Sequence, residues 1–396
     1  MQQQTKLRIG LVGFGVVGEG IYQVLKKTPS LEAEIVKIGI KDPTKTRNAP
    51  LELFTTNVDS LLEDANINVI VELIDDAEAA YHLVKKALKL GKSVVSANKK
   101  MIAAHQQELI ALQNESQTAL LYEAAVGGSL PIIRNLEEYY DNDLLHAVAG
   151  IINGSTNYIL SKLQATELSY EAALADAQTL GFAESDPSLD VSGNDSRNKL
   201  SIILNHAFGI LTPPEQIVCY GINHLRTDDI IYAKEKNWKI RLVAHARLLR
   251  DKLVQAYVLP TFVRAEDPLY SVDLENNGIA VGSSFSDQQF FSGKGAGRYP
   301  TASAVLSDIS ALRYDYKYEY RKFHSALGYQ ICNDNLVKVY LSYKNQDFVE
   351  KTDFDQIEES YESAELKFTV GWILLEKIRT SKWLKNPELS LILYQN

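Results

Sequence analysis

Cysteine is scarce in this sequence, because only Cys219 and Cys332 occur among its 396 residues. They are far apart and lack the paired spacing that a zinc site or a redox dithiol requires. We therefore expect two buried free thiols in a reducing compartment. The seven histidines are scattered, without an HExxH pattern or a pair at metal-ligand spacing. The sequence thus offers no ligand set for catalytic zinc, and it holds no GxSxG nucleophile elbow.

Long apolar runs and basic clusters are missing as well. No segment reaches the roughly 18 apolar residues of a membrane-spanning helix, and MQQQTKLRIGLVGFG has too short a polar lead for a signal peptide. The formal net charge of -9, without a run of Lys and Arg, makes nucleic acid a poor partner. We predict a cytoplasmic protein that binds neither nucleic acid nor membranes.

The first 130 residues alternate short apolar runs with longer helical patterns. Strands are predicted over LRIGLVGF, EIVKIGI, NVIVELI and SVVSA, and helices over about residues 15–27 and 77–90. Strands that are apolar throughout are typical of a sheet buried on both faces, and this alternation is typical of parallel βαβ units. We predict an α/β fold with a Rossmann-type, doubly wound parallel sheet over residues 1–130.

The regular alternation of predicted strands and helices ends after about residue 131. Helices are predicted near 170–180 and 195–208, and WKIRLVAHARLL and LVQAYVLPTFV predict a hairpin around Arg250 and Asp251. Residues 131–294 are therefore assigned to a second, α+β domain, and about 295–320 to a return into the first domain. Residues 321–396, with a helical pattern over about 365–381, form either a small regulatory module or a purely structural region.

A glycine pattern lies at the first junction of strand and helix. Gly13, Gly15 and Gly18 fit GxGxxG. Gly13 allows a tight turn, Gly15 lets the backbone approach a pyrophosphate, and Gly18 lets helix and strand pack closely. The N-terminus of the helix favours the negative charge of the phosphates. In its βαβ context the pattern predicts a dinucleotide site. The predicted cofactor-binding loop also contains Phe14, Val16 and Val17.

Two charged residues end the second predicted strand, namely Lys41 and Asp42. At this position a carboxylate binds the ribose hydroxyls of NAD, whereas a cation suits the extra phosphate of NADP. Lys41 is therefore a candidate cofactor ligand, but the pair leaves the choice between NADP and NAD open. A solvated turn explains the same two residues equally well.

Polar residues also follow later strands of this domain. Asn98 and Lys99 come after SVVSA, at the sheet edge where a doubly wound fold has its crevice, and are candidates to contact the cofactor.

EAAVGGSLPI places Glu123 before a glycine-rich bend. Its carboxylate and the carbonyl groups of the bend are oxygen ligands that suit a hard or monovalent cation. The residues by themselves favour a plain connection between domains over a cation site.

The richest segment is GFAESDPSLDVSGNDSRNKL, which concentrates Glu184, Asp186, Asp190, Asp195 and Lys199 between two predicted helices. Asp195 and Lys199 are four residues apart and therefore share a helix face. A capped helix start with a surface ion pair explains the pattern without any function. We favour a site for an amino-alcohol substrate, in which carboxylates hold the ammonium and a lysine handles the alcohol proton.

A second glycine-rich loop occurs in GKGAGRYPTASAVLSDI. Gly293, Gly295 and Gly297 precede a predicted helix. They either close over the cofactor, with Gly297 as a contact, or form a flexible hinge between domains.

Taken in order, these motifs resemble those of homoserine dehydrogenases. The set comprises GLVGFGVVGEG, VELI, SANKK, EAAVGGSLPI, GIINGSTNYIL, the acidic segment and GKGAGRYPTASAVLSDI, and it covers about residues 7–310. The resemblance implies an NAD- or NADP-dependent oxidoreductase that reversibly reduces L-aspartate 4-semialdehyde to L-homoserine, on the route to threonine, methionine and isoleucine. It also implies that the second domain binds the substrate and forms the interface of a homodimer or a dimer of dimers.

The resemblance further implies roles for single residues. Lys199 and Lys99 are the implied acid/base pair. Glu184 and Asp195 are implied to bind the substrate ammonium or to order the lysines, with Asp190 supporting that cluster. A lysine ammonium beside the aldehyde stabilises the negative charge that develops on its oxygen and supplies the proton. The implied substrate-binding residues are Glu184, Asp190, Asp195, Lys199 and Gly154.

A cation site is implied in the same way. The carbonyl groups of Val126 and Gly128, together with Glu123, match a sodium-type site of the family.

The sequence departs from the family pattern at three places. VELI is followed by Asp75 and Asp76 where the family commonly has two glycines, which puts acid beside the expected cofactor edge. Ser155 replaces the usual threonine and keeps its hydroxyl group. The carboxyl-terminal region does not clearly match the small ligand-binding regulatory domain of longer members. Feedback control by threonine therefore does not follow from the resemblance.

Two other functions are considered beside this one. One is a dehydrogenase of the same plan that acts on an amine, and the other is a non-catalytic dinucleotide sensor. The four-residue spacing of Asp195 and Lys199 argues against the sensor, because a sensor needs no proton donor beside a carboxylate cluster.

Overall fold

The computed structural model describes residues 6–142, 144–166, 168–250, 252–325, 327–363 and 366–394. The chain divides into two compact units. The first comprises Met1–Asp141 and Lys294–His324, and the second comprises Asn142–Gly293 and Ser325–Asn396. No helix among the described residues combines the length and the apolar character needed to cross a lipid bilayer.

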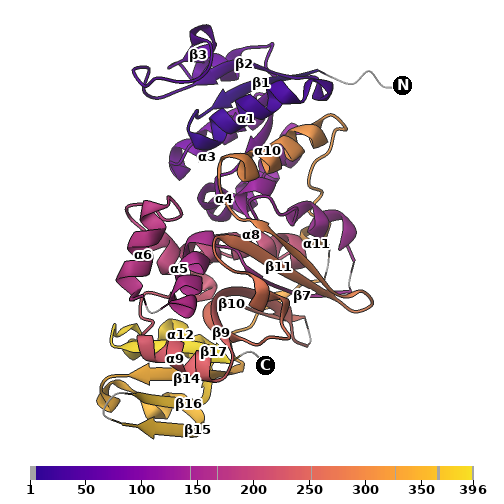
Figure 1. Cartoon of the computed structure of the whole chain (residues 1–396). Helices are drawn as coiled ribbons and strands as arrows, with labels where there is room; N and C mark the ends of the chain where they lie inside the picture. Colours follow the sequence, from indigo (N-terminus) through magenta and orange to yellow (C-terminus); the bar gives the residue numbers. More distant parts are fainter. Residues whose placement is uncertain are drawn as a thin grey trace. The chain divides into compact units, whose positions relative to one another are not determined.

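The first unit is built on a six-stranded parallel sheet (Figure 1). Its strand order, β3-β2-β1-β4-β5-β6, is that of a dinucleotide-binding sheet, in which the ligand crevice lies at the carboxyl ends of the strands where the order reverses. This confirms the predicted α/β fold. The strands are β1 (Leu7–Val12), β2 (Ala33–Gly39), β3 (Phe54–Thr55), β4 (Val69–Glu72), β5 (Ser93–Ser96) and β6 (Leu120–Leu121).

Helices connect these strands. The helices of this unit are α1 (Val16–Lys27), α2 (Asp59–Glu63), α3 (Ala77–Lys89), α4 (Lys99–Ser116), a π-helix η4 (Asn135–Tyr139), α10 (Arg298–Leu312) and α11 (Arg321–His324). α1 packs against α10, and α3 packs against α4. The predicted helices agree with α1 and α3 to within one residue. β3 and β6 were not predicted, because two-residue strands are too short to show an apolar pattern.

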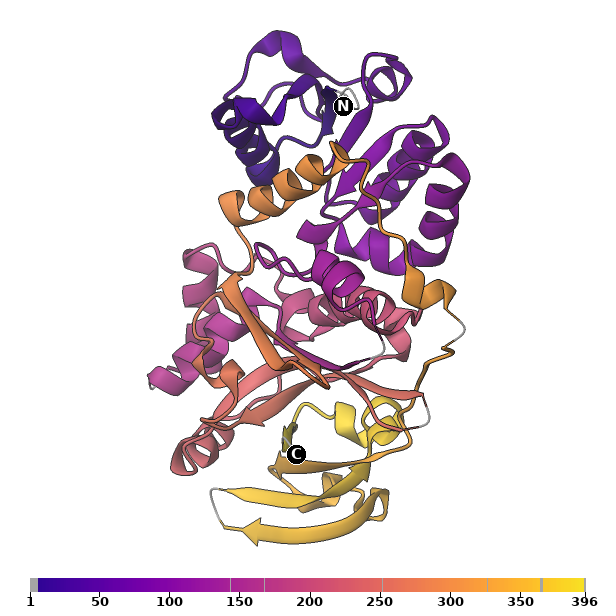
Figure 2. The same cartoon turned by 90° about the vertical axis from the view of Figure 1, so that its right-hand side faces the viewer.

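The described residues of the second unit form a mixed 11-stranded sheet (Figures 1 and 2). Its main path runs β12-β11-β7-β9-β10-β17-β14-β16-β15, and β8 and β13 pair with β10. The strands are β7 (Leu145–Ile151), β8 (Val218–Cys219), β9 (Lys239–Leu248), β10 (Leu253–Val263), β11 (Asn276–Ser283), β12 (Asp287–Lys294), β13 (Gln330–Ile331), β14 (Leu336–Tyr343), β15 (Phe354–Glu362), β16 (Lys367–Leu374) and β17 (Leu389–Tyr394). This mixed sheet confirms the predicted α+β second domain.

The predicted hairpin is confirmed. β9 and β10 are antiparallel and pair from Lys239 opposite Val263 to Leu248 opposite Val254. Asp251, expected in the turn, lies outside the described residues.

Six helices complete this unit, namely α5 (Gly154–Ala165), α6 (Tyr170–Thr179), α7 (Ser188–Val191), α8 (Asn194–Phe208), α9 (Thr227–Glu235) and α12 (Leu375–Thr380), counted over the described residues. α5 and α8 both pack against β9. The predictions of helices near 170–180 and 195–208 are confirmed by α6 and α8.

The C-terminal strands β13 to β17 join the same sheet, and β17 pairs in parallel with β10 (Figure 2, yellow). Neighbouring strands in the order β17-β14-β16-β15 are antiparallel, as in a split βαβ motif. The helix predicted over about 365–381 is wrong for most of its length. Residues 367–374 form β16, which is paired on both sides, and only α12 is helical. Pairing with distant strands overrode the local helical pattern.

The two cysteines are free thiols, as predicted. Both are half-buried, however, and the prediction that they are fully buried is wrong. Cys219 lies on the two-residue strand β8, whose one strand partner in the described sheet is β10. Its thiol donates to the carbonyl oxygen of Ser192 at 3.4 Å, and burial raises the pKa of the thiol to about 12.

Candidate active site

The turn between β1 and α1 has the geometry of a dinucleotide-binding loop. Gly13 has a φ of 98°, and a Cβ there would lie 2.5 Å from the carbonyl oxygen of Leu73. A Cβ on Gly18 would collide with the carbonyl oxygen of Gly13. The space beside Gly15, at the N-terminus of α1, is open, because a Cβ there would meet no other described part of the chain within 4 Å. A pyrophosphate can therefore approach the helix end closely.

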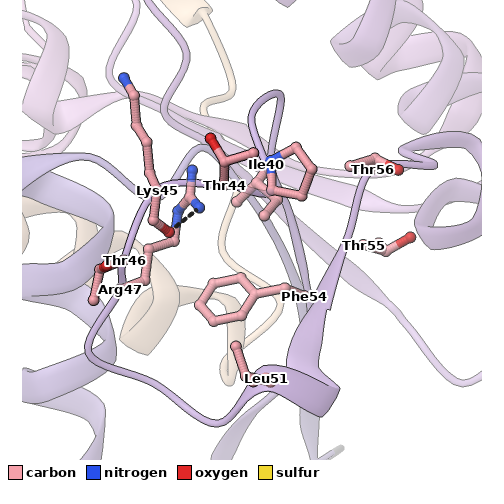
Figure 3. A pocket seen from close by; sticks show the side chains of 10 residues that line it. Ile40, Thr44, Lys45, Thr46, Arg47, Leu51, Phe54, Thr55 and Thr56 are labelled. Carbon is pink, nitrogen blue, oxygen red and sulfur yellow. Dashed lines mark hydrogen bonds between the residues drawn. The ribbon is translucent and has the colours of Figure 1, made fainter.

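Two adjoining cavities lie at this end of the sheet. One, of about 460 Å³, is lined by Phe14, Gly15, Val16, Glu19, Thr46, Arg47, Asn48 and Arg298. The other, of about 650 Å³, is lined by Ile40, Pro43, Thr44, Lys45, Thr46, Arg47, Leu51, Phe54, Thr55 and Thr56 (Figure 3). Arg47 belongs to both cavities, and its guanidinium lies 5.7 Å from the centre of the Phe54 ring. The walls thus combine cations and hydroxyl groups, which suit a phosphate.

The charged pair after β2 is arranged differently from the prediction. Lys41 is exposed and lines neither cavity. Asp42 accepts hydrogen bonds from the main-chain N–H and the hydroxyl group of Thr44, at 2.9 and 2.6 Å, and these bonds lower the pKa of its carboxyl group. The cations that line the cavity are Lys45 and Arg47, a few residues later, which sequence reasoning missed.

A buried carboxylate organises the carboxyl ends of β4 and β5. Glu72 is fully buried; it accepts hydrogen bonds from the hydroxyl of Ser96 at 2.5 Å and the N–H of Ile74 at 2.6 Å. The oxygen of Ser96 in turn accepts the N–H of Asn98 at 3.1 Å. Asn98 caps α4 and donates to the carbonyl oxygen of Ile74 at 3.0 Å. Lys99, half-buried, is the first residue of this helix.

The two acidic residues after VELI do not enter either cavity. Asp76 is the N-cap of α3 and accepts the N–H groups of Glu78 and Ala79 at 3.1 and 3.0 Å. Asp75 is exposed. At least one of the departures from the family pattern therefore has a structural role in starting a helix.

Glu123 is buried in the bend after β6, but its carboxylate is already used. It accepts the N–H groups of Ile133 at 2.7 Å and Arg134 at 3.0 Å. Its own N–H donates to the carboxylate of Asp308 at 2.9 Å, and burial raises the pKa of both carboxyl groups. The carboxylate thus anchors the backbone of Ile133 and Arg134.

The bend itself contacts the second glycine-rich loop within the first unit. Gly128 lies against the carbonyl group of Gly295, and the N–H of Ser129 donates to the carbonyl oxygen of Lys294 at 3.1 Å. Gly297 precedes α10, and Arg298 next to it lines the 460 Å³ cavity. In the described parts of the chain, no group of three or more His, Cys, Asp and Glu side chains is placed to hold a metal ion.

In the second unit, Asp195 and Lys199 form a buried ion pair on one face of α8. The ammonium of Lys199 lies 2.7 Å from the carboxylate of Asp195 and 2.7 Å from the carbonyl oxygen of Ile152. Asp195 is 4% exposed and Lys199 is 8% exposed. These values exclude the surface ion pair that the sequence left as an alternative. Asp195 lies in the first turn of the helix, where the helix dipole favours a negative charge.

Asn153 connects this pair to a second carboxylate. Its side-chain NH₂ donates to Asp190 at 2.7 Å and to Asp195 at 2.9 Å. Sequence reasoning missed Asn153, although an Asn before Gly-Ser-Thr is a recognisable helix N-cap signal. The structure therefore brings Asp190, Asp195 and Lys199 together through one amide.

The remaining candidates of the acidic segment lie around this cluster. Glu184 and Asp186 are exposed, and no hydrogen bond among the described residues joins the side chain of Glu184 to the cluster. Gly154 begins α5 directly after Asn153. The hydroxyl of Ser155 donates to the carbonyl oxygen of Phe182 at 2.6 Å, so the hydroxyl that this position shares with threonine anchors the acidic segment.

The burial of Glu72 predicts a specific dependence of stability on pH. Burial raises its pKa from 4.5 to about 7, so the folded state holds the proton more tightly than the unfolded state. The tighter proton binding contributes to the free energy of unfolding. This contribution is fully present below pH 4.5 and is lost as the pH rises through about 7. Between pH 5 and pH 8 we expect Glu72→Gln to gain roughly 2 to 3 kcal/mol of unfolding free energy relative to the unmodified protein.

Denaturant unfolding at several pH values measures this difference. Glu52→Gln, at an exposed position of the same unit, is the matched control and should show no such trend. A constant difference between Glu72→Gln and the unmodified protein from pH 5 to pH 8 would contradict the prediction.

Comparison with known proteins identifies the family. The family model described as homoserine dehydrogenase, NAD binding domain, matches residues 13–123, and the model described as homoserine dehydrogenase matches residues 131–310. A homoserine dehydrogenase of Synechocystis is 37% identical over 313 residues, which cover 76% of this chain and 72% of the relative.

Solved structures agree with this. The homoserine dehydrogenase of Thiobacillus denitrificans superposes with a TM-score of 0.86 at 27% identity over 98% of both chains. A hyperthermophilic archaeal homoserine dehydrogenase in complex with NADPH superposes with a TM-score of 0.68 at 26% identity, over 79% of this chain and 99% of the other. The chain therefore belongs to the homoserine dehydrogenase family of NAD(P)-dependent oxidoreductases.

Proposed function

We propose that this protein catalyses the reversible NAD(P)H-dependent reduction of L-aspartate 4-semialdehyde to L-homoserine, in the cytoplasm, on the route to threonine, methionine and isoleucine. The observation that carries the proposal is the buried cluster of Asp190, Asp195 and Lys199. It combines carboxylates for an ammonium with a lysine for an alcohol oxygen, as an amino-alcohol substrate requires. For the assembly we propose a homodimer or a dimer of dimers, which light scattering of the purified protein measures directly.

Lys199 is proposed as the acid that protonates the aldehyde oxygen. A lysine ammonium has three N–H groups, and within the described residues Asp195 and the carbonyl oxygen of Ile152 accept two of them. The third is available to an oxygen of the substrate, where it neutralises the developing negative charge and then transfers the proton. When bound, the nicotinamide supplies the hydride for the aldehyde carbon.

The other residues are proposed to bind and orient the substrate. Asp190 and Asp195 hold its ammonium group, and the exposed Glu184 contributes from the segment before α7. Lys99, at the start of α4 in the first unit, is proposed as the second member of the acid/base pair.

Substitution of Lys199 tests the assignment. We expect Lys199→Ala and Lys199→Arg to lose turnover by roughly a hundredfold or more, because each lacks a correctly placed, tunable acid. Lys199→Arg keeps a positive charge beside Asp195, so it separates loss of the proton donor from the destabilisation that an unpaired buried carboxylate causes. The measurement is NADPH formation from homoserine at 340 nm, together with cofactor binding by fluorescence.

The adjacent lysines of α4 supply a matched control. Lys100 is exposed whereas Lys99 is half-buried. Lys99→Ala should therefore lower turnover, and Lys100→Ala should not. Near-normal turnover of either Lys199 variant would refute the catalytic role of Lys199.

For the cofactor we propose a preference for NADP over NAD. Lys45 and Arg47 line the cavity beyond β2 together with hydroxyl groups of Thr44, Thr46 and Thr55. The nearby carboxylate, Asp42, is bound to Thr44 and lines neither cavity. Cations at this position suit the 2′-phosphate of NADP, whereas a free carboxylate would suit the ribose hydroxyls of NAD.

Arg47→Gln tests this preference. We expect KM for NADPH to rise roughly tenfold to a hundredfold, the effect of losing charge-assisted hydrogen bonds to a phosphate, while KM for NADH changes little. Lys41→Gln is the control, because Lys41 belongs to the same loop but lines neither cavity. Equal losses with both cofactors in Arg47→Gln, or a selective loss in Lys41→Gln, would contradict the assignment.

We also propose that a monovalent cation of sodium type binds the carbonyl groups of Val126 and Gly128. The backbone hydrogen bonds to Glu123 support carbonyl ligands instead of its carboxylate. Carbonyl oxygens are hard donors that suit such an ion. The cation would brace the bend after β6.

Thermal unfolding tests the cation site. A ligand at about five times its Kd stabilises the folded state by about 1 kcal/mol, so sodium chloride should raise Tm by roughly 2 to 4 °C over choline chloride at equal ionic strength. Equal Tm values in the two salts would contradict the proposal.

A further inference from the structure

Asn153 has more hydrogen bonds than a helix cap requires. Its side-chain oxygen accepts the N–H of Thr156 at 2.8 Å and the hydroxyl of Thr156 at 2.9 Å, which caps α5. Its NH₂ group donates to Asp190 at 2.7 Å and to Asp195 at 2.9 Å. The residue is 5% exposed, so water cannot easily replace these contacts. Capping uses one end of the amide, and the other end is committed to the two carboxylates.

The two carboxylates come from different elements and repel each other. Asp190 lies on α7 and Asp195 on α8. An amide that donates to both offsets this repulsion and fixes one oxygen of each carboxylate. The oxygen of Asp195 that accepts from Asn153 is Oδ2, the same atom that Lys199 contacts at 2.7 Å. The direction of this oxygen therefore determines where the ammonium of Lys199 lies.

The backbone beside Asn153 holds the ammonium from the other side. The carbonyl oxygen of Ile152, the preceding residue, accepts from Lys199 at 2.7 Å. One short segment thus positions Lys199 twice, by a carbonyl group directly and by the Asn153 amide through Asp195.

We propose that Asn153 is a positioning residue for the reaction, acting through Asp190 and Asp195 on the substrate ammonium and on Lys199. This inference rests on the proposed function. It adds to that function that the uncharged side-chain amide of Asn153 orients the carboxylates of Asp190 and Asp195.

The test uses substitutions that separate capping from positioning. Asn153→Ser keeps a good N-cap oxygen for α5 but removes both amide donors. Asn153→Asp also keeps the cap, and it replaces the donors by a third carboxylate beside Asp190 and Asp195. Ser169→Ala is the matched control, because Ser169 caps the neighbouring helix α6 through the N–H of Ala172 and has no contact with the cluster among the described hydrogen bonds.

Each variant is assayed as the full chain, for homoserine oxidation with NADP⁺, for NADPH binding and for Tm. For Asn153→Ser we expect Tm close to that of the unmodified protein and kcat lowered roughly tenfold to a hundredfold, because a misplaced reacting group costs about this much. KM for homoserine should rise while KM for NADP⁺ stays unchanged, since the predicted cofactor ligands lie in the other unit. Asn153→Asp should lose at least as much turnover. Ser169→Ala should keep kcat and lose only stability.

The alternative is that Asn153 is a helix cap and nothing more. In that case Asn153→Ser keeps kcat and both KM values within about twofold, and this result would overturn the inference. If Asn153→Ser did not fold, as shown by lost NADPH binding, Asn153→Asp decides: folded protein with unchanged turnover overturns the inference, and folded protein with lowered turnover supports it. Inactivity of the unmodified protein with homoserine would instead refute the proposed function.

Discussion

The candidate site of the second unit depends on one contact, the buried ion pair between Lys199 and Asp195. A buried ammonium is tolerated only when hydrogen bonds and an opposite charge replace the water that it has lost. Asp195 supplies the charge, the carbonyl group of Ile152 supplies a second acceptor, and Asn153 ties Asp195 to Asp190. The network joins Asp190 of α7 and Asp195 of α8 to Asn153, the N-cap of α5. These contacts hold the ammonium of Lys199 in one position.

The first unit also buries an ionisable group, but with neutral hydrogen-bond donors around it instead of an opposite charge. Glu72 is buried at the end of β4, and its hydrogen bonds reach Ser96, whose oxygen holds the backbone at Asn98. This network shapes the loop that starts α4 and so determines where Lys99 begins the helix. On the other side of β1, the glycine turn and the cavity lined by Lys45 and Arg47 supply space and positive charge without a buried ion pair. The two regions thus differ: hydrogen bonds fix the backbone at the start of α4, whereas the cavity beyond β2 is open and cationic.

The acidic residues show why residue type by itself does not identify a ligand. Glu123 looks like a cation ligand in the sequence, yet its carboxylate accepts two backbone N–H groups. Asp76 looks like a disturbance of the cofactor edge, yet it caps α3. Asp42 binds the loop residue Thr44. In each case the carboxylate accepts hydrogen bonds from main-chain N–H groups further along the chain, so the residue type does not by itself show what the carboxylate binds.

The sequence by itself determined the parts of this protein that depend on neighbours a few residues apart. These are the glycine turn after β1, the helices with clear apolar periodicity, the hairpin of β9 and β10, and the shared face of Asp195 and Lys199. Tertiary structure decided what depends on distant residues: β16 became a strand by pairing with β14 and β15, and Arg47 came to line a cavity with Phe54. Asn153 reached carboxylates 37 and 42 residues away. Local patterns reveal periodicity and caps, whereas hydrogen bonds and strand pairs between distant residues form only once the chain has folded.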